Sequence, residues 1–338
     1  MLRIDRQRVD LRAGVLGLAV LSVFAVAIAF WGPVAIAGAI GALVLLATDP
    51  PPAGRPLATA LLPLVVGGTV LTFIAVWIGG RPVPAAILVG VVGVAAALHA
   101  GRSRKAEIRG LIATVWIILA LTLYDTGVGA LGYAVAFAAG AAAGAGVTWS
   151  RSRSGSGEGG GSDDVEAGTA APTQSPFRAL LTSPLGQFAL LRGIGLAVAV
   201  LLGFALFPAH PAWLAITCLI VMRPPTRQAL VVGVQRSLGT GVGVIVAVAV
   251  AGLIGENTPG LVILFLASAF LMIAVREVNY ALFAMLLTAL IVYSQRILGA
   301  EAAESGRDRL GETLLGVVVA FVVLGLAEAL TRARKSVA

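Results

Sequence analysis

The sequence predicts an all-α membrane protein with about twelve transmembrane helices, arranged as two parallel six-helix repeats. Composition is the first reason, because 59% of the 338 residues are hydrophobic and 12% are charged, whereas a soluble globular chain has about 25% charged residues. One span needs about 20 apolar residues, so twelve would use roughly 240, and the chain can supply them. The second reason is the division of these residues into twelve runs.

The twelve runs are continuously apolar, and Gly and Pro punctuate many of the joints between them. Continuous apolarity favours helices over the alternating strands of a β-barrel. The first run follows four arginines and could be mistaken for a signal peptide, but it is nearly a full span and another run follows at once, so we expect it to be an uncleaved helix. The runs are 13–31, 33–48, 57–79, 82–100, 110–124, 128–149, 189–207, 211–222, 230–254, 259–275, 279–295 and 310–330.

The basic residues indicate the topology. With the N-terminus in the cytoplasm, inner segments hold twenty of the 24 Lys and Arg residues, and the outer segments hold Arg81, Arg296, Arg307 and Arg309. Lys and Arg collect on cytoplasmic loops, so we expect both termini in the cytoplasm. The net charge of +8 is then a matter of topology, and no nucleic-acid partner is expected. The Arg, Ala, Gly and Val bias indicates a GC-rich bacterial genome, and we expect the protein in a bacterial inner membrane.

A polar segment rich in Gly and Ser separates two similar halves. Residues 150–180 are predicted to be a flexible cytoplasmic linker between a first half, 1–149, and a second half, 181–338. Gly68-Thr69 in the third run answers Gly239-Thr240 in the ninth, and Phe137 in the sixth run answers Phe321 in the twelfth. Each half has an even number of runs, so the repeats would share one orientation about an axis along the membrane normal.

The eighth and ninth runs carry the most informative motifs. A short run with Trp213 is followed by a Pro turn at 224–225 and by the pattern Arg236-x-x-Gly239-Thr240-x-x-Gly243. This order resembles the fusaric acid resistance (FUSC) family, which includes aromatic acid exporters and is related to plant aluminium-activated malate transporters. Two further segments fit the same resemblance, Asn279-Tyr280 and Arg309-Leu-Gly-Glu-Thr313.

The resemblance covers about residues 185–330, and the first half fits only as a degenerate copy. It implies a transporter that exports small organic anions or aromatic carboxylic acids. A membrane scaffold or envelope-assembly factor is the alternative function, and a membrane enzyme acting on lipids is a third. Membrane lipids and a small organic anion are the expected partners, and a homo-oligomer stays open.

Arg236 is the leading candidate for contact with a transported anion. It shares one helix face with Gly239 and Thr240 and lies one or two turns inside an apolar run, where an ionisable residue usually faces a cavity or a partner. Anion contact, snorkelling to inner headgroups and a buried ion pair are all open for it. The glycines of this face are expected to let another helix approach closely.

Other candidates surround this helix. The runs 33–48 and 211–222 are short at corresponding positions, as is typical of a transporter's binding region. On the second of them Trp213 and Thr217 offer an aromatic face and a hydroxyl, although Trp213 equally fits an interfacial anchor. Arg223 and Arg227 could form a basic inner mouth that concentrates anions, or simply reflect topology. The substrate-path candidates also include Arg309 and Thr313, and Arg309 is expected to pair with Glu312 or face water.

Motifs of enzymes are missing from the sequence. It contains no phosphate-binding Gly-x-x-x-x-Gly-Lys-Ser/Thr loop, no His-Glu-x-x-His motif and no Ser/His/Asp set in the apolar region. We therefore expect no enzymatic activity, no cofactor and no metal. Glu328 could accept a proton or pair with the basic residues that follow it, and His99 and His210 are candidate pH-responsive groups. The lone cysteine, Cys218, cannot form an intrachain disulfide.

Overall fold

The structure is a computed structural model that describes residues 30–46, 57–101, 104–154, 183–222, 226–275 and 278–335, with a few isolated positions before residue 30. By its backbone contacts the chain divides into two compact units. One contains residues 1–26 and 205–324, and the other contains 27–204 and 325–338. The predicted linker falls almost entirely outside the described residues, apart from 150–154, which continue the preceding helix. The division into halves 1–149 and 181–338 stays a prediction.

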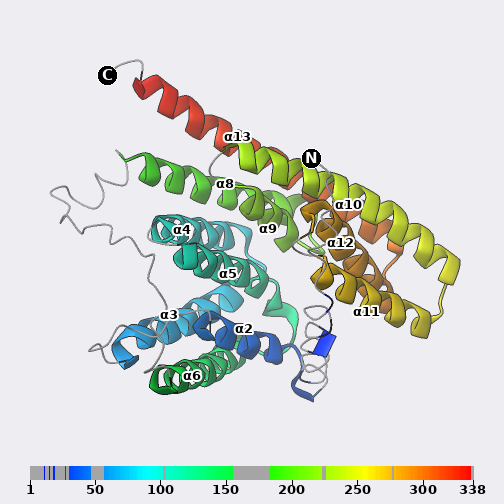
Figure 1. Cartoon of the computed structure of the whole chain (residues 1–338), viewed down its shortest axis with the longest axis horizontal. Coiled ribbons are helices and arrows are strands. Elements are labelled where there is room, and N and C mark those ends of the chain that lie inside the picture. Colours follow the sequence, from blue (N-terminus) through cyan, green and yellow to red (C-terminus); the bar gives the residue numbers. More distant parts are fainter. Residues whose placement is uncertain are drawn as a thin grey trace. The chain divides into compact units, whose positions relative to one another are not determined.

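The described residues contain eleven α-helices, one short 3₁₀ helix and no strand (Figure 1). The α-helices are α2 (Val34–Leu46), α3 (Leu57–Ile78), α4 (Pro82–Ala100), α5 (Arg104–Ala120), α6 (Ala130–Ser154), α8 (Pro184–Leu206), α9 (Ala212–Val221), α10 (Thr226–Ile254), α11 (Thr258–Ala274), α12 (Tyr280–Ile297) and α13 (Ala302–Lys335). The 3₁₀ helix, η2, covers Leu123–Asp125. The all-α prediction is thus confirmed for this part of the chain.

Each predicted apolar run from 33–48 onward coincides with one of these helices, and the first run, 13–31, lies largely outside the described residues. The largest difference is at α13, which begins at Ala302, whereas the apolar run begins at 310. The extra turns contain Ala302, Ala303 and Glu304, which favour helix. Apolarity indicates the part of a helix that suits lipid, and it does not indicate where the helix begins.

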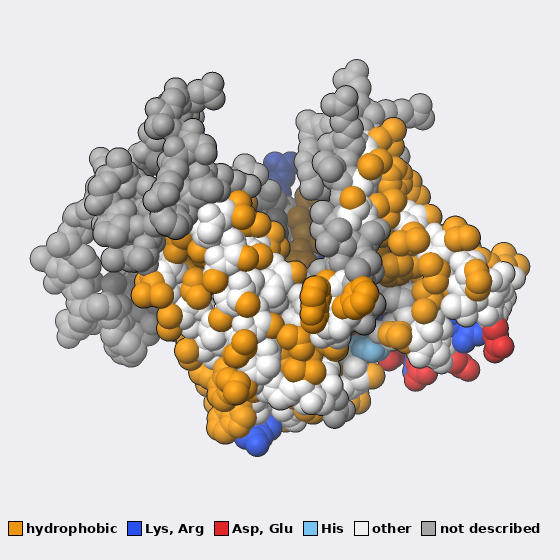
Figure 2. Space-filling view, turned by 90° about the horizontal axis from the view of Figure 1, so that it is seen from below, with side chains coloured by type: hydrophobic (Ala, Val, Ile, Leu, Met, Phe, Trp, Pro, Cys, Tyr) orange, Lys and Arg blue, Asp and Glu red, His pale blue; other side chains and the backbone are white. Residues whose placement is uncertain are grey.

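The outer surfaces of the helices are apolar. On α3 the exposed large side chains recur every three or four residues and so form one stripe, and α13 has a similar stripe. These side chains are Leu62, Val66, Val70, Phe73 and Trp77 on α3, and Leu314, Val318, Val322, Leu326 and Leu330 on α13. On the face in Figure 2, apolar side chains spread over the described surface, and charged side chains are confined to a few spots. Such stripes suit a lipid environment.

Seven of the described helices are long and apolar enough to cross a membrane, namely α3, α4, α6, α8, α10, α12 and α13. Three further apolar helices, α2, α9 and α11, are shorter. The chain is therefore a multi-pass membrane protein. At 1.5 Å per residue, the 13 residues of α2 and the 10 residues of α9 extend about 20 Å and about 15 Å, well short of a hydrocarbon core of about 30 Å.

In the unit that contains 27–204, α2, α3 and α6 lie side by side (Figure 1). The ring of Phe137 on α6 is buried and stacks on Trp116 of α5. The indole Nε1 of Trp116 donates a hydrogen bond of 2.8 Å to Thr72 Oγ1 on α3. Gly68 leaves the space that this phenyl ring occupies, because a Cβ there would overlap the Phe137 ring. Helices α3, α5 and α6 are thus joined around the Phe137 ring.

In the unit that contains 205–324, α12 packs against both α10 and α11 (Figure 1). The α10–α12 contact depends on small residues. A Cβ added to Gly243 would lie 2.6 Å from the backbone oxygen of Met285, so the two backbones can touch only without a side chain at this position. The predicted close approach of a helix to the glycine face of α10 is therefore present, and α12 is that helix.

Gly243→Ala is expected to destabilise the protein, because the new methyl group would force α12 away from α10. Overpacking of this kind costs roughly 1–3 kcal/mol. The matched control is Gly241→Ala, since a Cβ at Gly241 meets nothing within 4 Å. Thermal unfolding of the two purified variants in detergent checks this. Equal melting temperatures for the two variants would contradict the close approach.

Candidate functional site

Arg236 is a buried cation held by neutral groups. It lies on α10, and 1% of its surface is exposed. Its Nε and Nη2 both donate to the hydroxyl oxygen of Thr217 on α9, at 3.3 and 3.2 Å. Its Nη1 donates to the hydroxyl of Tyr280, the first residue of α12, at 3.1 Å. Among the described residues no carboxylate forms a salt bridge with this guanidinium.

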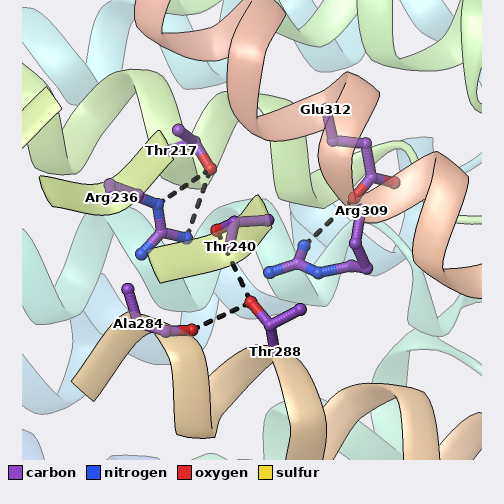
Figure 3. Close-up of polar contacts among 7 residues, drawn as sticks. All are labelled: Thr217, Arg236, Thr240, Ala284, Thr288, Arg309 and Glu312. Carbon is purple, nitrogen blue, oxygen red and sulfur yellow. Dashed lines mark hydrogen bonds and ion pairs between the residues drawn. The ribbon is translucent and has the colours of Figure 1, made fainter. Parts of the chain in front are cut away.

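The short helix α9 positions Thr217. Eight of its ten residues are buried, because α10 packs along it and Gly316 of α13 leaves room for its backbone. A Cβ at Gly316 would lie 2.8 Å from the carbonyl oxygen of Leu214. Thr217 is therefore fully enclosed, at 0% exposure, and its hydroxyl faces the Arg236 guanidinium (Figure 3).

Arg309 and Glu312 form a second buried polar group on α13. They are 2% and 0% exposed, respectively, and Arg309 Nη1 donates to Glu312 Oε2 at 3.0 Å. The guanidinium carbon of Arg309 lies 4.4 Å from the ring centroid of Trp213 on α9, a cation–π contact. The predicted pairing is present, but the pair is buried and does not face water.

Three polar atoms in this part of α13 are buried without a hydrogen-bond partner. They are Arg309 Nε, Glu312 Oε1 and the hydroxyl oxygen of the neighbouring Thr313. Buried polar atoms in folded proteins are nearly always hydrogen-bonded, and a bare one costs about 1–3 kcal/mol. Here three such atoms belong to residues within one turn and a half of the same helix. This clustering is typical of a place that a ligand, an ion or water completes.

Two more hydroxyls lie beside the cations. Thr240 on α10 is 1% exposed, and its hydroxyl oxygen is 3.5 Å from that of Thr288 on α12. The Thr288 hydroxyl donates to the carbonyl oxygen of Ala284 at 2.9 Å. In Figure 3 the guanidinium groups of Arg236 and Arg309 extend toward the region of Thr240 from opposite sides, and the two groups are close enough to interact electrostatically.

Counting the charges of this cluster gives an excess of one positive charge. Arg236 and Arg309 contribute two, and Glu312 contributes one negative charge. A further acid on the same helix, Asp308, is partly exposed and pairs with Arg307 at 3.7 Å. Burying an uncompensated charge is costly, so this excess charge is an unusual feature of the cluster. We refer to Arg236, Thr217, Thr240, Arg309, Glu312 and Trp213 as the α9–α10–α13 cluster.

His210 borders the cluster from the turn before α9. Burial lowers the pKa of this imidazole, Asp308 raises it in part, and Arg309 lowers it further. The lowered pKa keeps His210 neutral at pH 7, so it adds no charge to the cluster under ordinary conditions.

Most of the predicted substrate-path residues lie together in one unit, and the other candidates lie apart from this group. The structure brings together Arg236, Gly239, Thr240, Trp213, Thr217, Arg309 and Thr313 in one unit. Arg227 is exposed in the first turn of α10, which agrees with a surface cation, and Arg223 lies outside the described residues. Glu328 pairs with Arg332 on the exposed end of α13, and His99 lies in the last turn of α4.

Sequence reasoning missed three features in and beside the α9–α10–α13 cluster. The hydroxyl of Tyr280 binds Arg236 from 44 residues away, and no local spacing indicates that. Thr288 stands alone in an apolar run, which was the available signal for a polar contact. The pairing of Glu312 with Arg309 was predicted, but the burial of the pair was not, because the neighbouring residues are those of a surface segment. Among the described residues no group of three His, Cys, Asp or Glu side chains could hold a metal ion.

The fold and the cluster define a helical, multi-pass membrane protein with a buried cationic group enclosed by four of its helices. The match to known families agrees with this class. Residues 189–323 match the family described as fusaric acid resistance protein-like, which confirms the resemblance and covers every member of the α9–α10–α13 cluster. Neither a curated protein nor a solved structure matches the chain significantly.

Proposed function

We propose that the chain is a membrane transporter for small organic anions, including aromatic carboxylic acids, which it exports across a bacterial inner membrane. The observation that carries the proposal is Arg236, a cation that is 1% exposed and bonded to the hydroxyls of Thr217 and Tyr280. A carboxylate is a stronger partner for a guanidinium than a neutral hydroxyl. The export direction and the aromatic class rest on the family resemblance.

The excess positive charge of the cluster supports an anionic substrate over a neutral one. A carboxylate in this region would be attracted by both guanidinium groups, Arg236 and Arg309. The hydroxyls of Thr217 and Thr240 would then be within the same polar region to receive or donate hydrogen bonds. No covalent step is part of this proposal, since the cluster offers recognition and no nucleophile paired with a base.

We also propose the full architecture of twelve spans in two parallel repeats. Its support is a contact found twice: Gly68 on α3 makes room for Phe137 of α6, and Gly233 on α10 makes room for Phe321 of α13. These are the third and sixth helices of each predicted half. The second helix of each half, α2 and α9, is also short. In both halves, therefore, the same helices make a similar contact, with Gly233 instead of Gly239 in the place of Gly68.

Flux of a labelled anion tests the function. Proteoliposomes loaded with radiolabelled benzoate should lose it several-fold faster than protein-free liposomes, and unlabelled benzoate outside should exchange with it. A scaffold or assembly factor would give the protein-free rate. The matched control is reconstituted Arg236→Gln protein, which keeps the apolar surface but lacks the buried cation. Equal rates for all three preparations would overturn the proposal.

Topology has a separate test. With both termini inside, Ser156 is expected in the cytoplasm and Glu304 outside. In a Cys218→Ala background, a membrane-impermeant maleimide added to intact cells should label Glu304→Cys and not Ser156→Cys. After lysis both variants should react. Labelling of the 156 position in intact cells, with the 304 position protected, would reverse the assignment.

A further inference from the structure

Glu312 binds its arginine through one oxygen only. Oε2 accepts from Arg309 Nη1 at 3.0 Å, while Oε1 is buried with no partner, as is Arg309 Nε. Arginine and a carboxylate usually form two parallel bonds, and that fork is the strong arrangement. This pair therefore leaves one donor of the guanidinium and one acceptor of the carboxylate unused, although Glu312 is 0% exposed and water does not reach it freely.

The unused groups make the pair open to exchange. An incoming carboxylate could take Arg309 with two bonds through the terminal nitrogens Nη1 and Nη2, and it would then occupy the Nη1 that Glu312 holds with a single bond. Glu312 would then be a buried carboxylate without a cation, which is costly to keep ionised. A proton on Oε1 removes that cost, since the neutral acid needs no cation and can donate one hydrogen bond.

We propose that Glu312 is an internal competitor for Arg309, and that binding of the transported anion displaces it and is coupled to the uptake of one proton by Glu312. This inference rests on the proposed function. In the exchange, the Arg309–Glu312 ion pair breaks, an Arg309–anion pair forms, and a proton from solvent binds the Glu312 carboxylate. The net charge of the cluster is the same before and after, because one anion and one proton enter together.

The charged and titratable groups around Glu312 are few. Arg309 and Asp308 lie on its own helix, Arg236 approaches from α10, and His210 approaches Asp308 and Arg309 from the turn before α9. Arginines keep their protons across the physiological range. Among the described residues, His210 and Asp308 are therefore the two other groups in the vicinity that could exchange a proton when an anion binds, and the experiment has to separate them from Glu312.

The test is a proton count during anion binding. Sodium benzoate is added to the full-length protein in detergent, in weakly buffered solution at pH 7 with a pH indicator, and bound benzoate is measured by equilibrium dialysis with the labelled acid. The wild type should take up protons together with benzoate, at most one per benzoate bound. Its affinity should rise by up to about tenfold for each unit of pH lowered, the limit for one linked proton.

Matched variants assign the proton. Glu312→Gln, which resembles the protonated acid, should bind benzoate without proton uptake and with little dependence on pH. Three controls should keep the uptake: His210→Gln, Asp308→Asn and Glu304→Gln, the last an exposed acid on the same helix. Proton uptake that persists in Glu312→Gln would overturn the assignment. So would proton uptake that is lost in His210→Gln or in Asp308→Asn, each of which keeps Glu312.

A second measurement does not depend on the variant folding. Infrared difference spectra of the wild type, with and without benzoate, should show a new carbonyl band from a protonated, buried carboxyl group. Benzoate binding without this band and without proton uptake would overturn the inference and leave the proposed function standing. Failure to bind benzoate at all would contradict the proposed function, and the coupling would fall with it.

Discussion

Arg236→Lys is expected to lower the anion flux of proteoliposomes several-fold, and Arg236→Gln to abolish it. Lysine keeps the charge, but it has no planar fork for a carboxylate and cannot reach Thr217 and Tyr280 at once as the guanidinium does, with bonds of 3.1 to 3.3 Å. Bidentate recognition of a carboxylate is lost with it. Glutamine removes the charge that the anion has to meet inside the apolar region.

The control for this prediction is Arg227→Gln on the same helix. Arg227 is exposed, so its loss should weaken flux only modestly, through reduced electrostatic steering. The two Arg236 variants should elute from size exclusion like the wild type. If Arg236 merely snorkelled to headgroups, lysine would serve as well. Full flux by Arg236→Lys would therefore disprove a direct role in anion binding.

Breaking the Arg309–Glu312 pair from one side is expected to have the largest effect on stability. Arg309→Met leaves Glu312 at 0% exposure without its cation, and removing one partner of a buried ion pair typically costs about 3–5 kcal/mol. Replacing both, as Arg309→Met with Glu312→Met, should recover much of this loss, because two apolar side chains need no partners. Unfolding of reconstituted protein, followed by tryptophan fluorescence, measures the difference.

The exposed pair on the same helix gives the comparison. Glu328 and Arg332 also form an ion pair, but the Arg332 side chain is 78% exposed, and surface pairs contribute about 0–1 kcal/mol. Arg332→Met should change the unfolding free energy far less than Arg309→Met. Similar losses for the two single variants, or no recovery in the double variant, would argue against a buried and coupled pair.

Much of the fold could be predicted because lipid imposes a simple rule on the sequence. A helix that faces hydrocarbon is apolar along its length, so the run 82–100 gives the limits of α4 directly. The same rule fails at α13, because its first two turns are charged and yet helical. The rule also does not predict which helices pack together. The glycines of α10 show that some helix can approach closely, but only the structure shows that Gly243 lies against Met285 of α12.

The candidate site was predictable to a similar degree and for a related reason. A charge inside an apolar run is unusual, and that singled out Arg236 without any structure. Its hydrogen-bond partners could not be predicted, because Thr217 and Tyr280 are separated from it by 19 and 44 residues in the sequence. The pairing of Glu312 with Arg309 was predicted but its burial was not, because burial depends on what surrounds the first turns of α13, and the local composition there is that of a surface segment.

Cys218 follows Thr217 on α9 and is buried, with 0% of its surface exposed. It is the one cysteine of the chain, so a thiol reagent has a single target, and it can reach this target only when α9 parts from its neighbours. The rate of alkylation of Cys218 then measures how often α9, whose Thr217 binds Arg236, separates from its neighbours. Alkylation of this native cysteine therefore reports how often the cluster opens. The reaction can be followed by mass spectrometry in native membranes, without an introduced label.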